Sequence, residues 1–431
     1  MKLYSTKNKQ QEFTLGEAVL KGLPDDNGLF MPAHIPKLPD HFFKKLPEMS
    51  FPELSFAVAY ALIDGAIPYQ ELEKIVFESI DFPAPVVRLD EQTRILELFH
   101  GPTLAFKDFG ARFMARTMSY FNRTEKSELT ILVATSGDTG GAVASGFYDI
   151  PGINVIILYP KGKVSHLQEQ QLTTLGKNIT ALEVDGTFDD CQALVKKAFL
   201  DKDVTQHLRI SSANSINIAR LIPQSFYYFE AWKQVFQGQP PVFITPSGNF
   251  GNITAGLFAQ KMGLPVKKFI AANNANNIFY KYLQTGEYHP KPSIQTISNA
   301  MDVGAPSNFA RIMDLYGSTW NNVKADIDGF TVNDDATLSG INQVFTKYQY
   351  IIDPHGAVGY LAFKEYQKKN PDDMGIILET AHPSKFIDVL PEPISKKVII
   401  PERLAVLAEK TKVATPMSIQ YKDFKEYLLN R

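Results

Sequence analysis

The stretch ILELFHGPTLAFKDFGARF, residues 95–113, predicts a strand that turns directly into a helix. Its first five residues form an apolar run typical of a strand, whereas Phe109, Phe113 and Met114 recur at helical spacing. Lys107 therefore lies in the first turn of the predicted helix, between two phenylalanines.

The position of Lys107 is unfavourable for a charged ammonium group. The positive end of a helix disfavours cations, and burial among aromatic rings disfavours any charge. Both effects lower the pKa of a lysine toward neutrality, and a neutral amine can form a covalent imine with an aldehyde. The alternative is a side chain that extends into solvent as an ordinary surface charge, and spacing alone leaves both interpretations open.

Six further apolar runs, rich in β-branched residues, alternate with amphipathic segments along the chain. They occupy residues 129–135, 154–160, 179–184, 241–246, 267–273 and 374–380. Alternation of this kind indicates parallel strands joined by crossover helices, so the predicted fold class is α/β. Residues 1–85 differ, because they are predicted to be mostly helix and turn, and the proline-rich segment 81–90 marks a boundary.

The composition is ordinary for a globular protein of 431 residues. Its 44 Lys and Arg residues nearly balance 46 Asp and Glu residues, which gives no electrostatic reason to expect a nucleic acid or a membrane as partner. The only cysteine, Cys191, excludes a disulfide framework and a thiolate zinc site. Residues 1–13 lack the apolar core of a signal peptide, and no apolar run approaches about 18 residues, so we expect a cytoplasmic protein.

Two predicted strands lead into glycine-rich turns that are followed by helices. The turns are TSGDTGGAVASG at 135–146 and SGNFGN at 247–252. Glycine lets backbone N–H groups approach an anion closely, and a helix N-terminus adds about half a positive charge. Each turn alone is equally consistent with a simple structural role. Two of them at the carboxyl ends of parallel strands favour a phosphate-bearing ligand. Neither matches a dinucleotide or nucleoside-triphosphate motif.

Two other segments carry polar side chains suited to a ligand. In SSANSINIARLIPQ, residues 211–224, Arg220 is accompanied by the neutral donors Asn214, Ser215 and Asn217, a combination that can bind a phosphate or a carboxylate. The alternative for this segment is a helix N-cap by Asn214 or Ser215 with a solvated arginine. In ETAHPSKF, residues 379–386, the hydroxyl of Thr380 can hydrogen-bond a ring nitrogen without imposing a charge, although most threonines at strand ends are structural.

Taken together, these segments resemble the threonine synthases, which are pyridoxal-phosphate enzymes with the tryptophan synthase β-type fold. The resemblance covers nearly the whole chain and is closest to the long form with an extra N-terminal domain. The matching motifs, in the family's order, are KGLPDDNGLFMP (21–32), HGPTLAFKDFGARF (100–113), ATSGDTGGAVASGF (134–147), LYPKGKVSHLQEQQLTT (158–174), SSANSINIARLIPQ (211–224), PSGNFGN (246–252), SNAMDVGAPSNFAR (298–311), DPHGAVGY (353–360) and ETAHPSKF (379–386).

The resemblance implies an architecture of two open, mostly parallel-sheet domains of the pyridoxal-phosphate fold type II, plus an α-rich N-terminal domain. The expected divisions are an N-terminal domain at 1–85, a large cofactor-binding domain at 86–111 and 221–391, a smaller α/β domain at 112–220, and a C-terminal segment at 392–431.

The resemblance also implies roles for individual residues. Lys107 would hold pyridoxal 5'-phosphate covalently, and Thr380 would face its pyridine nitrogen. The cofactor phosphate would be bound by Gly248, Asn249, Phe250, Gly251 and Asn252. The substrate carboxylate would be bound by Ser136, Gly137, Asp138 and Thr139, and the substrate phosphate by Asn214, Ser215 and Arg220 with Asn252. Asp138 departs from shorter relatives, which carry Asn there, and a carboxylate would repel a substrate carboxylate unless it is protonated or turned away.

The implied reaction is the last step of threonine biosynthesis, in which O-phospho-L-homoserine and water give L-threonine and phosphate. One alternative is another lyase of the same cofactor fold, such as a threonine dehydratase or a phospho-lyase. Another is a non-catalytic metabolite-binding α/β protein. We expect no metal, since His100, His355 and His382 form no metal-binding pair, and either a monomer or a homodimer.

Overall fold

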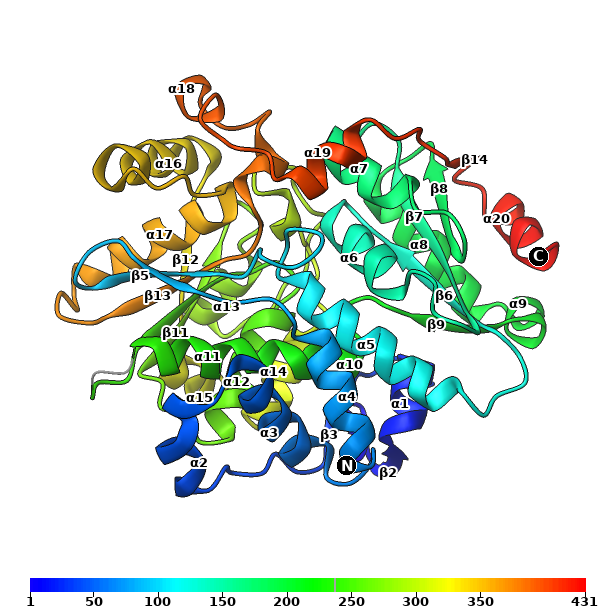
Figure 1. Cartoon of the computed structure of the whole chain (residues 1–431), viewed down its shortest axis with the longest axis horizontal. Coiled ribbons are helices and arrows are strands. Elements are labelled where there is room, and N and C mark those ends of the chain that lie inside the picture. Colours follow the sequence, from blue (N-terminus) through cyan, green and yellow to red (C-terminus); the bar gives the residue numbers. More distant parts are fainter. Residues whose placement is uncertain (236–237) are drawn as a thin grey trace.

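The computed structural model describes residues 1–235 and 238–431. It contains three sheets, of six, five and three strands, with helices packed around them (Figure 1). The six-stranded and the five-stranded sheets are built mostly from parallel strands, as the alternating pattern of the sequence predicts. The α/β prediction is therefore confirmed.

The six-stranded sheet has the order β12-β11-β10-β13-β5-β4. In this order its strands are Ile327–Thr331, Lys268–Asn273, Val242–Pro246, Gly375–Glu379, Thr93–Glu97 and Val86–Arg88. Only β4 is antiparallel to its neighbour. Strand β13 is central, because Ile377 pairs with Ile244 of β10 and with Ile95 of β5. The main helices that lie between these strands along the chain are α11 (Phe226–Val235), α12 (Gly251–Lys261), α16 (Asp334–Tyr348) and α17 (Pro354–Gln367).

The five-stranded sheet is entirely parallel and has the order β14-β8-β7-β6-β9. Its strands are Thr415–Met417, Ile179–Val184, Ile153–Pro160, Leu129–Ala134 and Arg209–Ser212. Its helices are α6 (Asp138–Phe147), α7 (His166–Thr173), α8 (Phe188–Leu200), α9 (Lys202–His207) and, from the end of the chain, α20 (Tyr421–Leu429). Cys191 lies in α8, where burial raises the pKa of its thiol to about 12.

The N-terminal region contains a three-stranded antiparallel sheet that the sequence analysis missed. Its strands are β2 (Asn8–Thr14), β1 (Lys2–Ser5) and β3 (Phe30–Pro32), in that order across the sheet. Strand β2 reads NKQQEFT and is almost fully exposed, so it lacks the apolar alternation by which a strand is recognised. The expected helices are present as α1 (Leu15–Lys21), α2 (Asp40–Lys45), α3 (Phe51–Ile63) and α4 (Tyr69–Ser79).

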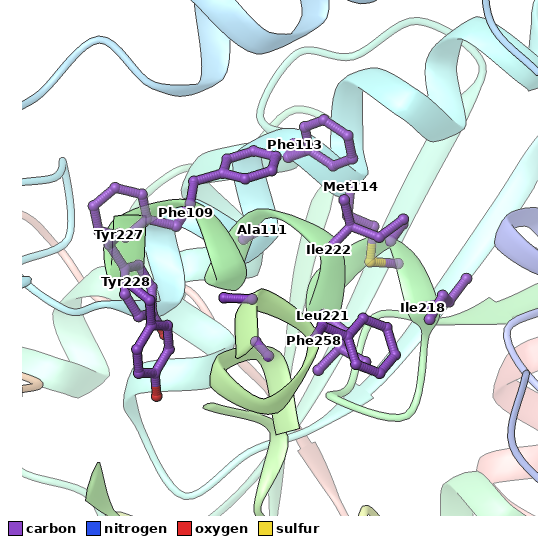
Figure 2. Close-up of a cluster of buried hydrophobic side chains, with 14 of the residues drawn as sticks. Phe109, Ala111, Phe113, Met114, Ile218, Leu221, Ile222, Tyr227, Tyr228 and Phe258 are labelled. Carbon is purple, nitrogen blue, oxygen red and sulfur yellow. The ribbon is translucent and has the colours of Figure 1, made fainter. Parts of the chain in front are cut away.

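Helix α5 (Lys107–Asn122) runs through the middle of the molecule and joins its parts. It contacts α1 and α4 of the N-terminal region, α6 of the five-stranded sheet and the short helix α10 (Ile218–Leu221). Its buried side chains pack against the segment that leads into α11. Figure 2 shows Phe109, Ala111, Phe113 and Met114 beside Ile218, Leu221, Ile222, Tyr227, Tyr228 and Phe258. The position of Lys107, at the start of α5, is therefore fixed by a rigid core.

The remaining α-helices are α13 (Ile278–Thr285), α14 (Phe309–Leu315), α15 (Trp320–Asp326), α18 (Glu392–Ser395) and α19 (Glu402–Ala408). Across the described residues, every helix is too short or too polar to cross a membrane. Each of the six apolar runs named above contains a strand, whereas β4, β9, β12 and β14 were not predicted. These four have five residues or fewer, too few to show a period.

Candidate active site

Backbone hydrogen bonds hold the start of α5 against the end of strand β13. The amide of Leu98 donates to the carbonyl of Glu379 at 3.0 Å, and the amide of Phe106 donates to the carbonyl of Thr380 at 2.9 Å. A bridge between Ala105 and Ala381 continues this pairing. Thr380 is thus fixed beside the residue that precedes Lys107.

The amine of Lys107 is partly buried and lies 5.8 Å from the centre of the Phe106 ring. Burial is the main cause that lowers its pKa to about 8; the charge of Asp138 opposes this, and the positive charges of Arg220 and Lys385 add to it. The uncharged form of the amine is therefore easily reached near neutral pH. Because Asp138, Arg220 and Lys385 all influence this pKa, the segments that carry them lie close to Lys107.

The first glycine turn lies between strand β6 and helix α6 and is stabilised internally. Thr135 accepts hydrogen bonds from the amides of Gly137 and Gly140 at 3.0 and 2.8 Å. Gly137 has a φ of +138°, and a Cβ atom there would lie 2.6 Å from the side chain of Gln168. Only glycine fits this position, and the turn presents the N-terminus of α6, where Ser136 and Thr139 flank Asp138.

Asp138 is buried and is neutralised by a lysine that the sequence analysis did not single out. The Nζ atom of Lys385 lies 2.5 Å from its Oδ1, and Gln168 donates to the same oxygen at 2.9 Å. Although burial raises the pKa of Asp138, Lys385 and Lys107 hold it well below its ordinary range. The side chain of Lys385 is fully buried and also donates to the carbonyl of Thr103 at 3.0 Å.

The second glycine turn lies between strand β10 and helix α12. A Cβ atom on Gly248 would lie 2.8 Å from the carbonyl oxygen of Ala300 and from the Cα of Met301, so the site tolerates no side chain there. Phe250 has a φ of +62°, and α12 begins at the next residue, Gly251. The turn therefore presents backbone amides and a helix N-terminus, as an anion-binding turn does.

Asn252, in the first turn of α12, has an amide group whose orientation is fixed. Its Oδ1 accepts hydrogen bonds from the hydroxyls of Tyr227 and Tyr228 at 2.6 and 2.9 Å. Its Nδ2 is buried and has no partner among the described residues. A buried donor without a partner is unfavourable, so this N–H₂ group is available for a ligand.

Arg220 is 2% exposed and packs against α5 one turn after Lys107. Its Nη1 donates to the carbonyl of Ala213 at 2.8 Å, whereas its Nε has no hydrogen-bond partner in the described chain. Burial lowers its pKa to about 10, opposed by the charge of Asp108. A Cβ atom on Gly110 would lie 3.2 Å from this Nε, so the glycine makes room for the guanidinium group.

Three asparagines of the site have different environments. Asn249 donates to the hydroxyl of Ser215 at 2.6 Å and so joins the second glycine turn to the segment at 211–224. Asn214 has a buried Oδ1 without a partner in the described part of the chain. Asn217, which the sequence analysis counted among the donors, is occupied: it caps α10 through Ala219 and donates to the carbonyl of Val19 at 2.9 Å. The cap of α10 is therefore Asn217 and not Asn214 or Ser215, and Arg220 is buried rather than solvated.

These contacts bring the separately predicted segments together around Lys107. The charges of Asp138, Arg220 and Lys385 act on its amine. The carbonyl of Thr380 accepts a hydrogen bond from the amide of Phe106, the residue before Lys107. A pyridoxal phosphate fits the residues present, since it needs a lysine that readily loses its proton and a glycine turn at a helix N-terminus. No group of three or more His, Cys, Asp or Glu that could hold a metal occurs in residues 1–235 and 238–431.

Three family models match the chain. The model described as pyridoxal-phosphate dependent enzyme matches residues 82–379, that of the threonine synthase N terminus matches 2–80, and that of the threonine synthase C-terminal region matches 356–428. Threonine synthase from Haemophilus influenzae is 42% identical over 432 residues, covering 100% of both chains.

Solved structures agree with the family models. The crystal structure of threonine synthase from Escherichia coli has 40% identity and a TM-score of 0.92, with 100% of both chains covered. A structure of PLP-bound threonine synthase from Brucella melitensis has 34% identity and a TM-score of 0.93, covering 100% of this chain and 99% of the other. These full-length matches are incompatible with a non-catalytic binding protein. The chain belongs to the threonine synthase family of pyridoxal-phosphate-dependent enzymes.

Proposed function

We propose that the enzyme converts O-phospho-L-homoserine and water into L-threonine and phosphate. The observation that supports this choice is Arg220, a buried guanidinium group beside α5 with an unpartnered Nε. A cofactor phosphate needs one anion site, and the second glycine turn can supply it. A substrate with its own phosphate requires a further buried cation. A threonine dehydratase does not need one, because its substrate carries no phosphate.

The substrate phosphate would bind to Asn214, Ser215, Arg220 and Asn252. The free Nε of Arg220 and the free Nδ2 of Asn252 are donors that the fold leaves without partners. Asn249 already bonds Ser215, so the hydroxyl of Ser215 is held in place at the junction of the two anion-binding segments. Donors that are oriented before the substrate arrives cost little reorganisation when it binds.

The substrate carboxylate would bind at the N-terminus of α6, to Ser136, Gly137 and Thr139. Asp138 begins this helix, but its ion pair with Lys385 cancels its charge. The backbone amides of the turn are then left to attract the carboxylate. We assign Asp138 the role of orienting the turn rather than touching the carboxylate.

The cofactor would be held covalently by Lys107, by Gly248 to Asn252 around its phosphate and by Thr380 opposite its ring nitrogen. Once bound, pyridoxal phosphate stabilises negative charge at the α-carbon of an amino-acid substrate. The hydroxyl of Thr380 would hydrogen-bond the ring nitrogen without protonating it, which would moderate that stabilisation.

Lys107 is the group that would move protons. Its lowered pKa lets the amine take a proton from the α-carbon, release it again within the site, and then take one from the β-carbon. Loss of the β-proton breaks the bond from the γ-carbon to the phosphate oxygen, and the electron pair of that bond leaves on the phosphate. Arg220 stabilises the charge on the departing phosphate. Water then adds its hydroxyl to the β-carbon and gives its remaining proton to the released phosphate, and the two protons taken from the carbons return to the γ-carbon and the α-carbon.

Product analysis tests the proposal against its rivals. Purified holoenzyme with O-phospho-L-homoserine should release phosphate and L-threonine in equal amounts. Phosphate release with a keto acid instead of threonine would identify a phospho-lyase. Consumption of added threonine would identify a dehydratase.

The identity of the substrate does not determine the oligomeric state or the cellular location of the enzyme. We propose a cytoplasmic monomer or homodimer, consistent with the near-zero net charge and the single, buried cysteine. The division into domains at 1–85, 86–111 with 221–391, and 112–220, followed by the segment 392–431, stays our proposal. Light scattering coupled to size exclusion measures the mass of the assembly.

A further inference from the structure

Arg311, in helix α14, is a fully buried guanidinium group without a carboxylate partner in the described part of the chain. All its hydrogen bonds go to uncharged oxygens. Nε and Nη2 donate to the carbonyl of Phe30 at 3.2 and 3.0 Å, Nη2 also donates to Ile216 at 2.6 Å, and Nη1 donates to Ser215 at 3.3 Å and to Oδ1 of Asn308 at 2.7 Å. Burial lowers its pKa to about 9.

These bonds join three segments that lie far apart in the sequence. Phe30 belongs to strand β3 of the N-terminal sheet, 281 positions from Arg311. Ser215 and Ile216 belong to the segment that would bind the substrate phosphate. Asn308 extends the contact to the second glycine turn, because its Nδ2 donates to the carbonyl of Asn249 at 3.0 Å.

An arginine suits this position better than a neutral residue. Its planar group supplies five N–H donors in a fixed geometry, enough to satisfy carbonyls from several directions. Carbonyl dipoles compensate its charge only in part, and a buried cation without a counter-ion is costly. The bound phosphates would supply the missing negative charge near it.

We propose that Arg311 is a positioning residue for the substrate phosphate, which it serves by fixing Ser215 and Asn249 from behind and by tying them to the N-terminal sheet. This inference rests on the proposed function, in which a phosphate binds next to Ser215. It gives the N-terminal region an indirect part in substrate binding. Arg311 acts through its neighbours and does not touch the substrate.

The rival interpretation is that Arg311 only stabilises the core, and Arg112 provides a matched control for it. Arg112 also ties α5 to the N-terminal region, through the carbonyls of Ser79 and Glu78 at 3.1 and 2.6 Å and through Asp81. It contacts neither anion-binding segment. R311M and R112M should therefore both lower the melting temperature, but only R311M should weaken phosphate binding.

The experiment measures the dissociation constant of inorganic phosphate by calorimetry on folded holoenzyme, together with KM and kcat. We expect R311M to raise the dissociation constant and KM by about tenfold or more, with kcat falling less than about threefold. R311K, which keeps the charge but loses the planar fork, should lie between R311M and the unmodified enzyme. R112M should leave both constants within about twofold of the unmodified enzyme.

A dissociation constant in R311M within about twofold of the unmodified enzyme would refute the proposal. If R311M does not fold, N308S decides the matter. It removes the link to Asn249 while leaving the bonds to Phe30, and we expect it to weaken phosphate binding several-fold; unchanged binding in N308S would also refute the proposal. Because phosphate binding is measured without turnover, a failure to make threonine would refute the proposed reaction separately.

Discussion

The two glycine turns look alike in sequence but differ in how their charges are balanced. At the first turn, Asp138 at the start of α6 forms an ion pair with Lys385. The two side-chain charges cancel, so no net side-chain charge remains at this turn. Beside the second turn, Arg220 and Arg311 are buried without any salt bridge in the described residues. One end of the site is therefore neutral and the other is positive.

This difference suits the two ends of the proposed substrate. A carboxylate carries one negative charge, and a phosphate carries close to two at neutral pH. The electrostatic contrast would orient the molecule before any specific hydrogen bond forms. Lys107 lies between the two ends and is influenced by both, since Asp138, Arg220 and Lys385 all act on its pKa.

Removal of Lys107 should have the largest effect, because it eliminates the group shared by both ends. We expect K107A to lower kcat by about 10³-fold, within the range for loss of a group that moves protons. It should also abolish the absorbance band near about 410 nm that a lysine-bound cofactor gives. K107R, which keeps a positive charge but cannot form the covalent bond, should be equally inactive. A K107R enzyme with substantial turnover would show that the assignment of Lys107 is wrong.

Breaking the ion pair at the first turn should make that end of the site negative instead of neutral. K385M leaves Asp138 as an uncompensated buried carboxylate, which typically costs about 3–5 kcal/mol of stability. We expect urea unfolding to show this loss and KM to rise, because Asp138 would then repel the substrate carboxylate.

Two further variants sharpen the test of this ion pair. The double variant D138N/K385M should recover most of the lost stability, because it removes both charges. K412M breaks the pairs of Lys412 with Glu169 and Glu183, which are more exposed, and should cost only about 0–1 kcal/mol. Equal losses in K385M and K412M would contradict the interpretation.

Loss of the guanidinium at the second end should affect binding more than turnover. R220A removes a charge-assisted contact worth about 1.5–3 kcal/mol, so KM should rise by about tenfold to a hundredfold. Arg209, which starts strand β9 and donates to the carbonyl of Ser127, is the control, and R209A should leave KM unchanged. Steady-state kinetics with O-phospho-L-homoserine measures both. A normal KM with a collapsed kcat would assign Arg220 to the chemical step instead.

The pH dependence of cofactor capture tests the balance at Lys107 and is the smallest expected effect. An amine with a pKa of about 8 is mostly protonated at pH 7 and mostly neutral at pH 9, so the neutral fraction rises by about tenfold. The rate at which cofactor-free protein captures pyridoxal phosphate should rise accordingly with pH. Because the charge of Asp138 raises the pKa of Lys107, D138N should move the midpoint to lower pH. Stopped-flow absorbance follows the rate, and an unshifted midpoint in D138N would count against this coupling.

The parts of the site that depend on local sequence could be predicted. The strand-to-helix junction at Lys107 and the glycines at 137 and 248 follow from spacing and from the backbone geometry that a tight turn requires. Strands such as β6, β7 and β10 were visible because their apolar runs are buried on both faces.

The parts that depend on distant partners could not be predicted. Lys385 stands in a segment that was recognised, but nothing in its spacing shows that it pairs with Asp138. The bonds of Arg311 to Phe30 span 281 positions, and the amide of Asn252 is oriented by two tyrosines 25 and 24 positions before it. Such pairings are set by the packing of whole elements.

The buried thiol of Cys191 makes the enzyme a convenient host for spectroscopic labels. A thiol with a pKa of about 12 in a closed core reacts poorly with maleimides or methanethiosulfonates. Cysteines introduced on the surface of α8 and α16 could therefore be labelled in pairs without first replacing the native residue. Distances between such labels would show whether one sheet moves relative to the other during a catalytic cycle.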